Sequence, residues 1–220
     1  MQKTIRFLAM IVIGLWLSGC SSVYTIRVNG YTEPSAPAPV KPGGFFCVME
    51  NKESKNPLLE AEVKDKITKL LETRGFPVTS IEKADYYLFF AYGLGEPRSV
   101  GVAAPDYFGS IGWGVGHGGY GWGGPGFAIG VPYGAYGANT ATLYDRWLLI
   151  NVVEGPAYRT QKISRPVWVG EARSVGSSSD LRTVLNYLLV ADFKQFGQNT
   201  GKAVTVEIET KNPEVASLTH

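Results

Sequence analysis

The sequence predicts an α+β fold, with two amphipathic helices packed on one face of a mixed or antiparallel sheet. Short apolar or alternating segments typical of strands recur along the 220 residues, and two segments carry apolar residues at helical spacing. A third observation is a long segment rich in glycine and aromatic residues that matches neither pattern. We interpret it as an insertion between two strands.

The first expected strand covers residues 23–28, where apolar and polar side chains alternate. Asn29-Gly30 then predicts a turn, and the stretch from Pro34 to Pro42 predicts an extended connector. We therefore assign residues 20–43 to an anchored strand and connector that precede a single domain over residues 44–210. A second strand, over residues 45–49, opens that domain.

The first helix is expected to begin at Pro57, after the capping residue Asn56, and to end at Gly75. The segment from Ala84 to Tyr92 is apolar on both faces, which predicts a strand deep inside the sheet. The apolar residues of the helix recur at helical spacing: Leu59, Val63, Ile67, Leu70 and Leu71.

Two further strands are expected over residues 143–153 and 167–173, joined by a turn at Gly155-Pro156 and a polar connection. A second helix follows, with an apolar stripe of Leu181, Val184, Leu185, Leu188 and Phe196.

The second helix is capped by Ser179 or Asp180, and Gly197 ends it. Alternating apolar residues over 204–208 predict the last strand. Residues 211–220 are expected to be a disordered tail.

The insertion runs from Gly109 to Asn139. The many glycines disfavour a regular helix or strand in the core there. So many aromatic side chains are also not expected to stay exposed to water without a contact. Two interpretations stay open: a surface that binds a partner, and a flexible insertion without one. The candidate partner-binding residues are Trp113, Tyr120, Trp122, Phe127, Tyr133 and Tyr136.

Residues 1–19 have the pattern of a secretory signal, with Lys3 and Arg6 before an apolar run too short for a permanent membrane anchor. The run ends in Leu17-Ser18-Gly19-Cys20, which resembles the lipobox of bacterial lipoproteins. The resemblance implies cleavage between Gly19 and Cys20. It also implies a diacylglycerol thioether and an N-acyl chain on Cys20, which together anchor a protein without a transmembrane helix.

Removal of this signal changes the charge balance, because the count of basic residues falls from 21 to 19 and equals the 19 acidic residues. A chain without a basic excess is not expected to bind nucleic acid. Ser21 stands where an aspartate favours inner-membrane retention in enterobacterial sorting, so the lipobox resemblance implies the outer membrane, facing the periplasm. With Cys20 lipidated, Cys47 has no partner for an intramolecular disulfide.

A second resemblance rests on the Ala84-Asp85 strand entry, the Gly/Tyr/Trp-rich insertion with the long strand after it, and Val167-Trp168-Val169-Gly170 before the closing helix. In this order the mature chain resembles a family of bacterial envelope lipoproteins known as domain of unknown function 4136 (DUF4136). The resemblance implies an envelope location and this fold. It implies no activity.

Patterns for cofactors and catalysis are weak. Residues 114–119, Gly-Val-Gly-His-Gly-Gly, match the spacing of a dinucleotide fingerprint, but no helix is expected after them, so we expect no nucleotide. The only histidines are His117 and His220, and Asp106 is the one acidic residue near His117, which argues against a metal site and a histidine-dependent hydrolase. We therefore expect no catalytic residue and no cofactor other than the covalent lipid.

Charged residues in two strands are interpreted as surface charges. Asp145 and Arg146 could form an ion pair at the solvent face, and Glu171 and Arg173 lie on one face of their strand.

Three other side chains are given structural interpretations. Cys47 lies in an apolar strand and is expected to behave as a small buried hydrophobe, not as a reactive thiol. Trp168 and Tyr187 could stack on a glycan, but packing in the core or on a helix is the favoured interpretation.

The sequence thus favours a lipid-anchored, non-enzymatic envelope protein that binds another envelope protein, peptidoglycan or lipid. Two alternatives stay open. A hydrolase of envelope material could act through carboxylates alone if two of them faced one cleft. A surface or adhesive protein could self-associate through the glycine- and aromatic-rich insertion.

Overall fold

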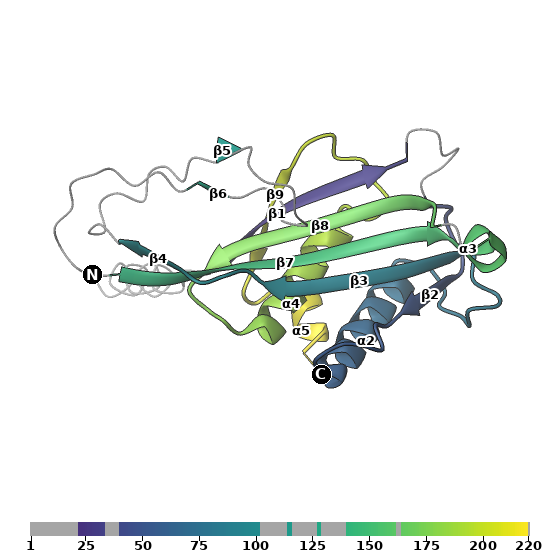
Figure 1. Cartoon of the computed structure of the whole chain (residues 1–220), viewed down its shortest axis with the longest axis horizontal. Coiled ribbons are helices and arrows are strands. Elements are labelled where there is room, and N and C mark those ends of the chain that lie inside the picture. The colour runs from purple at the N-terminus through teal and green to yellow at the C-terminus, as the bar shows by residue number, and fades with distance from the viewer. Residues whose placement is uncertain are drawn as a thin grey trace, which may run out of the picture.

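The computed structural model describes residues 22–33, 40–101, 114–115, 127–128, 140–161 and 164–219. Figure 1 shows a large mixed sheet with α2 (Pro57–Thr73) and α4 (Leu181–Phe193) along one face of it, which confirms the α+β class. The signal segment and most of the insertion lie outside the described residues, so the predictions made for them stay predictions.

The main sheet has seven strands, six of them in the spatial order β2-β3-β7-β8-β1-β9. β2 and β3 are parallel and the other described pairs are antiparallel. β3 lies between β2 and β7, so it is the interior strand that its two apolar faces predicted. The six strands are β1 (Val23–Thr32), β2 (Phe46–Met49), β3 (Tyr86–Leu94), β7 (Thr140–Glu154), β8 (Pro166–Gly176) and β9 (Val204–Glu209).

The seventh strand, β4 (Arg98–Gly101), pairs with the first residues of β7, and its last pair is Gly101 with Thr140. These two residues flank segment 102–139 and face each other in an antiparallel ladder, so their Cα atoms lie about 5 Å apart. Inside that segment, β5 (Gly114–Val115) and β6 (Phe127–Ala128) form a separate antiparallel pair.

The caps of both long helices are those that the sequence predicted. Asn56 Oδ1 accepts a hydrogen bond from the Leu59 amide at 3.1 Å, and Asp180 Oδ1 accepts one from the Thr183 amide at 3.1 Å. These bonds satisfy amides that have no partner inside the first helical turn. α4 ends at Phe193, four residues before Gly197.

α4 is the centre of the core, because every residue from Val184 to Phe193 is buried. It contacts the sheet on one side, and α2 and α5 (Pro213–Ser217) elsewhere. α5 lies in the segment for which disorder was expected. The difference arises because Val215 and Leu218, which are 4% and 1% exposed, join the core and stabilise a short capped helix.

The expected turn at Gly155-Pro156 is the first turn of another helix, α3 (Gly155–Gln161). The ring of Tyr158 in this helix packs against Tyr87 and Phe89, with centroids 5.5 and 5.6 Å apart. Tyr87 belongs to a small second cluster of buried residues, so α3 covers one end of the face opposite α2 and α4.

Asn29-Gly30 lies inside β1, so the turn prediction there was wrong. Gly30 faces Gly170 in the ladder between β1 and β8, and a Cβ at Gly30 would lie 3.3 Å from Nε1 of Trp168. A Cβ at Gly170 would collide with the ring of Trp168 itself. Glycine is therefore required here for close approach, not for a turn. β1 lies between β8 and β9 and is part of the domain, not of the connector.

Candidate functional site

Most residues that the sequence predicted as functional lie outside the described part of the chain. Gly19 and Cys20 precede residue 22, and His117 is in the insertion. Phe127 belongs to β6, but its side chain is not among those described. The binding role of the aromatic residues stays a prediction for Phe127 and for Trp113, Tyr120, Trp122, Tyr133 and Tyr136, which lie outside the described residues.

A pocket of about 310 Å³ opens where β1 and β8 separate. The ladder between these strands runs from Thr32–Trp168 to Arg27–Arg173 and goes no further. Before Arg27, β1 continues beside β9 alone, and after Arg173, β8 continues beside β7 alone. The pocket is lined by Val23, Tyr24, Thr25, Arg146, Val175, Gly176, Ser177 and Ser178.

Arg146 of β7 supplies the charge of this pocket and is 3% exposed. Its Nη1 donates to the Ser178 carbonyl oxygen at 3.4 Å, a long and weak bond, and its Nε is buried without a hydrogen-bond partner among the described residues. Gly176 makes room for the guanidinium, because a Cβ there would lie 2.5 Å from Nη2. Burial lowers the pKa of Arg146, while Tyr24 and Asp145 raise it.

Hydroxyl groups surround the guanidinium. Ser174 faces Arg146 directly across the ladder between β7 and β8, and its buried Oγ also has no partner among the described residues. Ser177 and Ser178 line the pocket at its mouth. The ring of Tyr24 stacks on Tyr187 of α4, with centroids 4.0 Å apart. A guanidinium and several hydroxyls can donate hydrogen bonds to one oxyanion, so the pocket has the chemistry of an anion site.

Asp145 and Arg146 were expected to form an intrastrand or cross-strand ion pair at the solvent face. Asp145 forms a cross-strand ion pair with Arg173, whereas the surface position expected for Arg146 was wrong. Successive residues of a strand point to opposite faces, so Arg146 points into the helix-covered side and Asp145 away from it. The alternation of Arg146 with the buried Leu148 and Ile150 was the signal in the sequence that could have found this.

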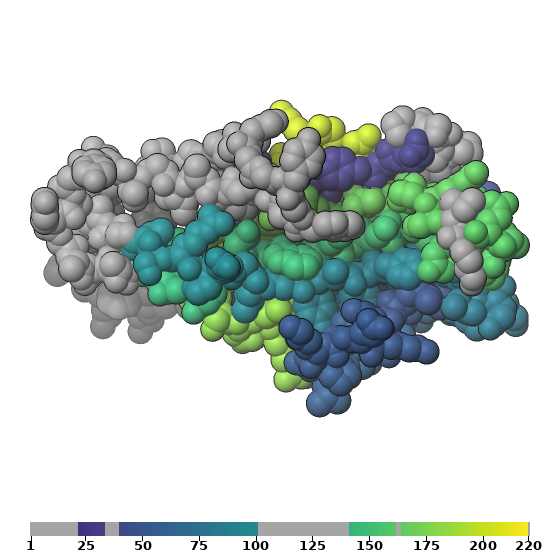
Figure 2. All heavy atoms as spheres, in the orientation of Figure 1, coloured from purple at the N-terminus to yellow at the C-terminus, as the bar shows by residue number. Residues whose placement is uncertain are grey.

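On the opposite face of the sheet, Asp145 and Glu171 share Arg173. Arg173 Nε lies 2.6 Å from Glu171 Oε1, and Arg173 Nη1 lies 3.7 Å from Asp145 Oδ2. Burial raises the pKa of Asp145, whereas Arg173 lowers it. Figure 2 shows this side, with strands β3, β7 and β8 across the middle of the view. Leu149 and Tyr31, 38% and 50% exposed, project from the same strand face.

Cys47 is a half-buried free thiol beside the small cluster under α3. Burial raises its pKa, while Lys64 lowers it and Glu82 raises it further. Its Sγ lies 3.8 Å from Met49 Sδ. The raised pKa disfavours the reactive thiolate, which agrees with the structural interpretation of this residue.

Trp168 and Tyr187 both pack in the core, which agrees with the interpretation favoured from the sequence. Trp168 is fully buried, its Nε1 donates to the Gln198 carbonyl oxygen at 3.0 Å, and its ring packs on Phe196. Tyr187 is 7% exposed and its hydroxyl donates to the Thr210 carbonyl oxygen. Neither ring offers a face to a sugar.

Asp192 in α4 is a second buried charged residue that the sequence did not single out. It is fully buried, and neither carboxyl oxygen has a partner among the described residues. Its Oδ1 would lie 2.7 Å from a Cβ at Gly170, so the carboxyl group lies against the sheet. Burial holds its pKa well above the ordinary range, and Glu171 raises it further.

Two findings concern the described residues as a whole. No three histidine, cysteine, aspartate or glutamate side chains among them are grouped closely enough to hold a metal ion. No helix in the same part of the chain is both long and apolar enough to cross a membrane.

Comparisons with known proteins give a family and distant structural relatives. No curated protein matches the chain. A PelC dodecamer from Paraburkholderia phytofirmans is similar at 12% identity and a TM-score of 0.40, over 80% of this chain and 99% of that one. A PDZ domain protein from Parabacteroides distasonis is similar at 15% identity and a TM-score of 0.47, over 90% of this chain and 42% of that one. The family model for DUF4136, a domain of unknown function, matches residues 31–196, well over half of the chain, and the protein therefore belongs to this family.

Proposed function

We propose that the protein is a lipid-anchored envelope lipoprotein, held at the outer membrane and facing the periplasm, which binds a partner without catalysing a reaction. The observation that carries this proposal is the sequence Leu17-Ser18-Gly19-Cys20, followed after two residues by the first strand of the domain at Val23. A short link of this kind holds the domain close to the lipid.

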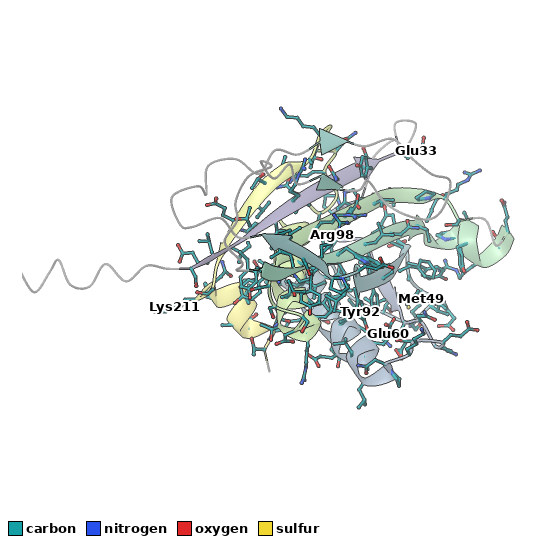
Figure 3. All side chains as sticks on the ribbon, turned by 60° about the vertical axis from the view of Figure 1, so that its left-hand side comes forward. Glu33, Met49, Glu60, Tyr92, Arg98 and Lys211 are labelled. Carbon is teal, nitrogen blue, oxygen red and sulfur yellow. The ribbon has the colours of Figure 1, made fainter. Side chains whose placement is uncertain are left out.

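The position of β1 says which end of the domain would face the membrane. Ser22 comes just before β1, and Thr210 comes just after β9. The carbonyl oxygen of Ser22 accepts a hydrogen bond from the Thr210 amide at 3.0 Å, so the start of β1 lies beside the end of β9. Two residues of chain span at most about 7 Å, so a lipid on Cys20 would lie within that distance of Ser22 along the chain. Figure 3 labels Lys211 at this end of the sheet, where β1 begins.

Replacing Cys20 with alanine should abolish incorporation of labelled palmitate and release the protein from the membrane fraction or leave it as precursor. The reason is that two or three acyl chains supply the whole membrane affinity of such an anchor. Labelling and detergent partition measure both effects. Cys47→Ala is the matched control and should keep label and membrane attachment. A labelled, membrane-bound Cys20→Ala protein would rule out the proposed anchor.

The partner-binding half of the proposal rests on the insertion over residues 109–139, which lies within the segment between the paired residues Gly101 and Thr140. Replacing residues 102–139 with Asn-Gly, a two-residue hairpin turn, should not lower the unfolding midpoint, because closing a shorter loop costs less entropy: about 0.6 kcal/mol less per halving, and about 2.5 kcal/mol less for the change from 38 residues to two. Crosslinked partners recovered from intact cells should disappear. A second variant keeps the full loop but carries serine at the six candidate aromatic positions. It shows whether the loss of partners comes from the missing aromatic side chains or from the shorter loop.

The deletion also decides between the functional alternatives. Loss of crosslinked copies of the chain itself would favour the self-associating protein, and loss of a different protein would favour the accessory role. A deletion variant that keeps every partner would remove the insertion from the proposal. Support for a non-enzymatic role comes from Asp145 and Glu171, since both carboxylates contact Arg173 instead of facing each other across a cleft.

A further inference from the structure

We infer that the pocket between β1 and β8 is a binding site for a phosphate-bearing anion, held by the guanidinium of Arg146. The pocket has a volume of about 310 Å³, which is larger than one phosphate group needs. The inference concerns these described residues and does not involve the insertion.

The first argument is the cost of burying Arg146. A guanidinium stays protonated in proteins, and a buried charge destabilises the fold unless an opposite charge and hydrogen bonds compensate. Arg146 makes no salt bridge within the described residues, and its only hydrogen bond there is the long one to Ser178. Two half-buried arginines of this domain, Arg74 and Arg173, each have a carboxylate within 2.8 Å, and a third, Arg159, donates to the carbonyl oxygens of Ile81 and Ala84. A bound anion supplies to Arg146 what Glu214 and Glu171 supply to those two.

The second argument is the composition of the walls. The residues that line the pocket with Arg146 include Ser177, Ser178 and Thr25, and none of them is aspartate or glutamate. Asp180, the next acidic residue along the chain after Ser178, caps α4 at Thr183, whose side-chain hydroxyl and backbone amide both hold the pKa of Asp180 low. A guanidinium with no carboxylate in the lining favours a tetrahedral oxyanion, which accepts several hydrogen bonds at once.

The position of the pocket relative to the membrane also favours a phosphate group, an inference that rests on the proposed function. The pocket is lined by Val23, three residues after Cys20, so a lipid anchor would hold its mouth near the phosphate layer of the membrane. Lys211, beside Thr210 at the same end, is exposed and does not line the pocket, so it offers a control charge for the test. The phosphate group therefore has two sources, a phospholipid headgroup or free phosphate, which the experiment separates.

The test is calorimetric titration of the full chain in an uncharged detergent with three probes: inorganic phosphate, dihexanoyl phosphatidylglycerol, and dihexanoylglycerol, which has the same tails without phosphate. Wild-type protein should bind one or both phosphate probes and not dihexanoylglycerol. Arg146→Gln should weaken that binding by about tenfold or more, because it removes a charge-assisted contact. Lys211→Gln, which removes an exposed charge from the same end, should change the affinity by less than about threefold.

A second pair of variants guards against a folding defect at the buried position. Ser177→Glu places a carboxylate at the mouth of the pocket and should abolish binding of the phosphate probes. Ser179→Glu makes the same change two residues away, at an exposed position that does not line the pocket, and should leave binding intact. Unfolding midpoints of both variants confirm that each is folded.

Binding of phosphate alone identifies a soluble ligand, and binding of phosphatidylglycerol alone identifies a headgroup site. No binding of either probe, or equal affinities for Ser177→Glu and Ser179→Glu, overturns the inference. The titration does not depend on acylation. If Cys20 takes up no palmitate label but the protein still binds the phosphate probes, the result contradicts the proposed lipid anchor and not the anion site. A lipidated chain without anion binding contradicts this inference alone.

Discussion

Replacing Trp168 with alanine should lower the free energy of unfolding by about 3 to 5 kcal/mol, as truncation of a fully buried aromatic side chain does. The indole is 0% exposed and packs over two glycines, Gly30 and Gly170, whose missing side chains leave the space that it fills. Truncation also leaves the carbonyl oxygen of Gln198 without its donor. Urea unfolding followed by circular dichroism measures the change.

The matched control is Trp147→Ala on the neighbouring strand. Trp147 is only partly buried and points to the opposite face, where it lies over Gly93. Its truncation should cost about 1 to 2 kcal/mol, because less area leaves the protein interior. Equal losses for the two variants would contradict the assignment of Trp168 to the centre of the core.

Replacing Asp192 with asparagine should stabilise the protein at neutral pH, because it removes a fully buried carboxyl group whose ionisation the fold disfavours. Burial raises the pKa of Asp192 in the folded protein, with Glu171 adding to the effect. Below about pH 4 the carboxyl group is protonated in both the folded and the unfolded chain and contributes no difference. As the pH rises above that value the unfolded chain ionises first, so the wild-type protein loses stability until the pH passes the folded pKa.

The measurement is the difference in unfolding free energy between Asp192→Asn and wild type from pH 3 to pH 8. It should be near zero at the acidic end and grow as the pH rises. Glu62 and Asp180, whose pKa values are lowered in the fold, produce the opposite trend in both proteins and cancel in the difference. Asp65→Asn, at an exposed position in α2, should show no such growth. Parallel profiles for Asp192→Asn and wild type would contradict a raised pKa.

The elements most accurately predicted were those with local signals. Asn56 and Asp180 cap the helices because their side chains reach amides three residues away, a relation contained within one turn. β3 is interior because both its faces are apolar, and that too can be read along the chain. Asn29-Gly30 has a turn signal as strong as these, but it lies in a ladder with Glu171 and Gly170 of β8, which follow it by more than 130 residues.

The candidate anion site was not predictable in the same way. Tyr24, Arg146 and Ser174 come from three strands, and their contact depends on the order in which β1, β8 and β7 lie in the sheet. Strand alternation could have placed Arg146 on the covered face. It could not show that β1 and β8 stop pairing at Arg27 and Arg173.

The sequence by itself determined the class of fold, the cap Asn56 and the lipobox prediction, and it narrowed the second cap to Ser179 or Asp180, since each depends on residues close together in the chain. Tertiary structure decided the rest. The helix α5 forms because Val215 and Leu218 pack into the core. Arg173 binds Glu171 and lies near Asp145, whereas Arg146 is buried without an ion pair among the described residues. The physical reason is that burial and charge compensation are properties of the assembled sheet and helices. A strand's own residues fix which face each side chain takes, but only its neighbours decide what that face meets.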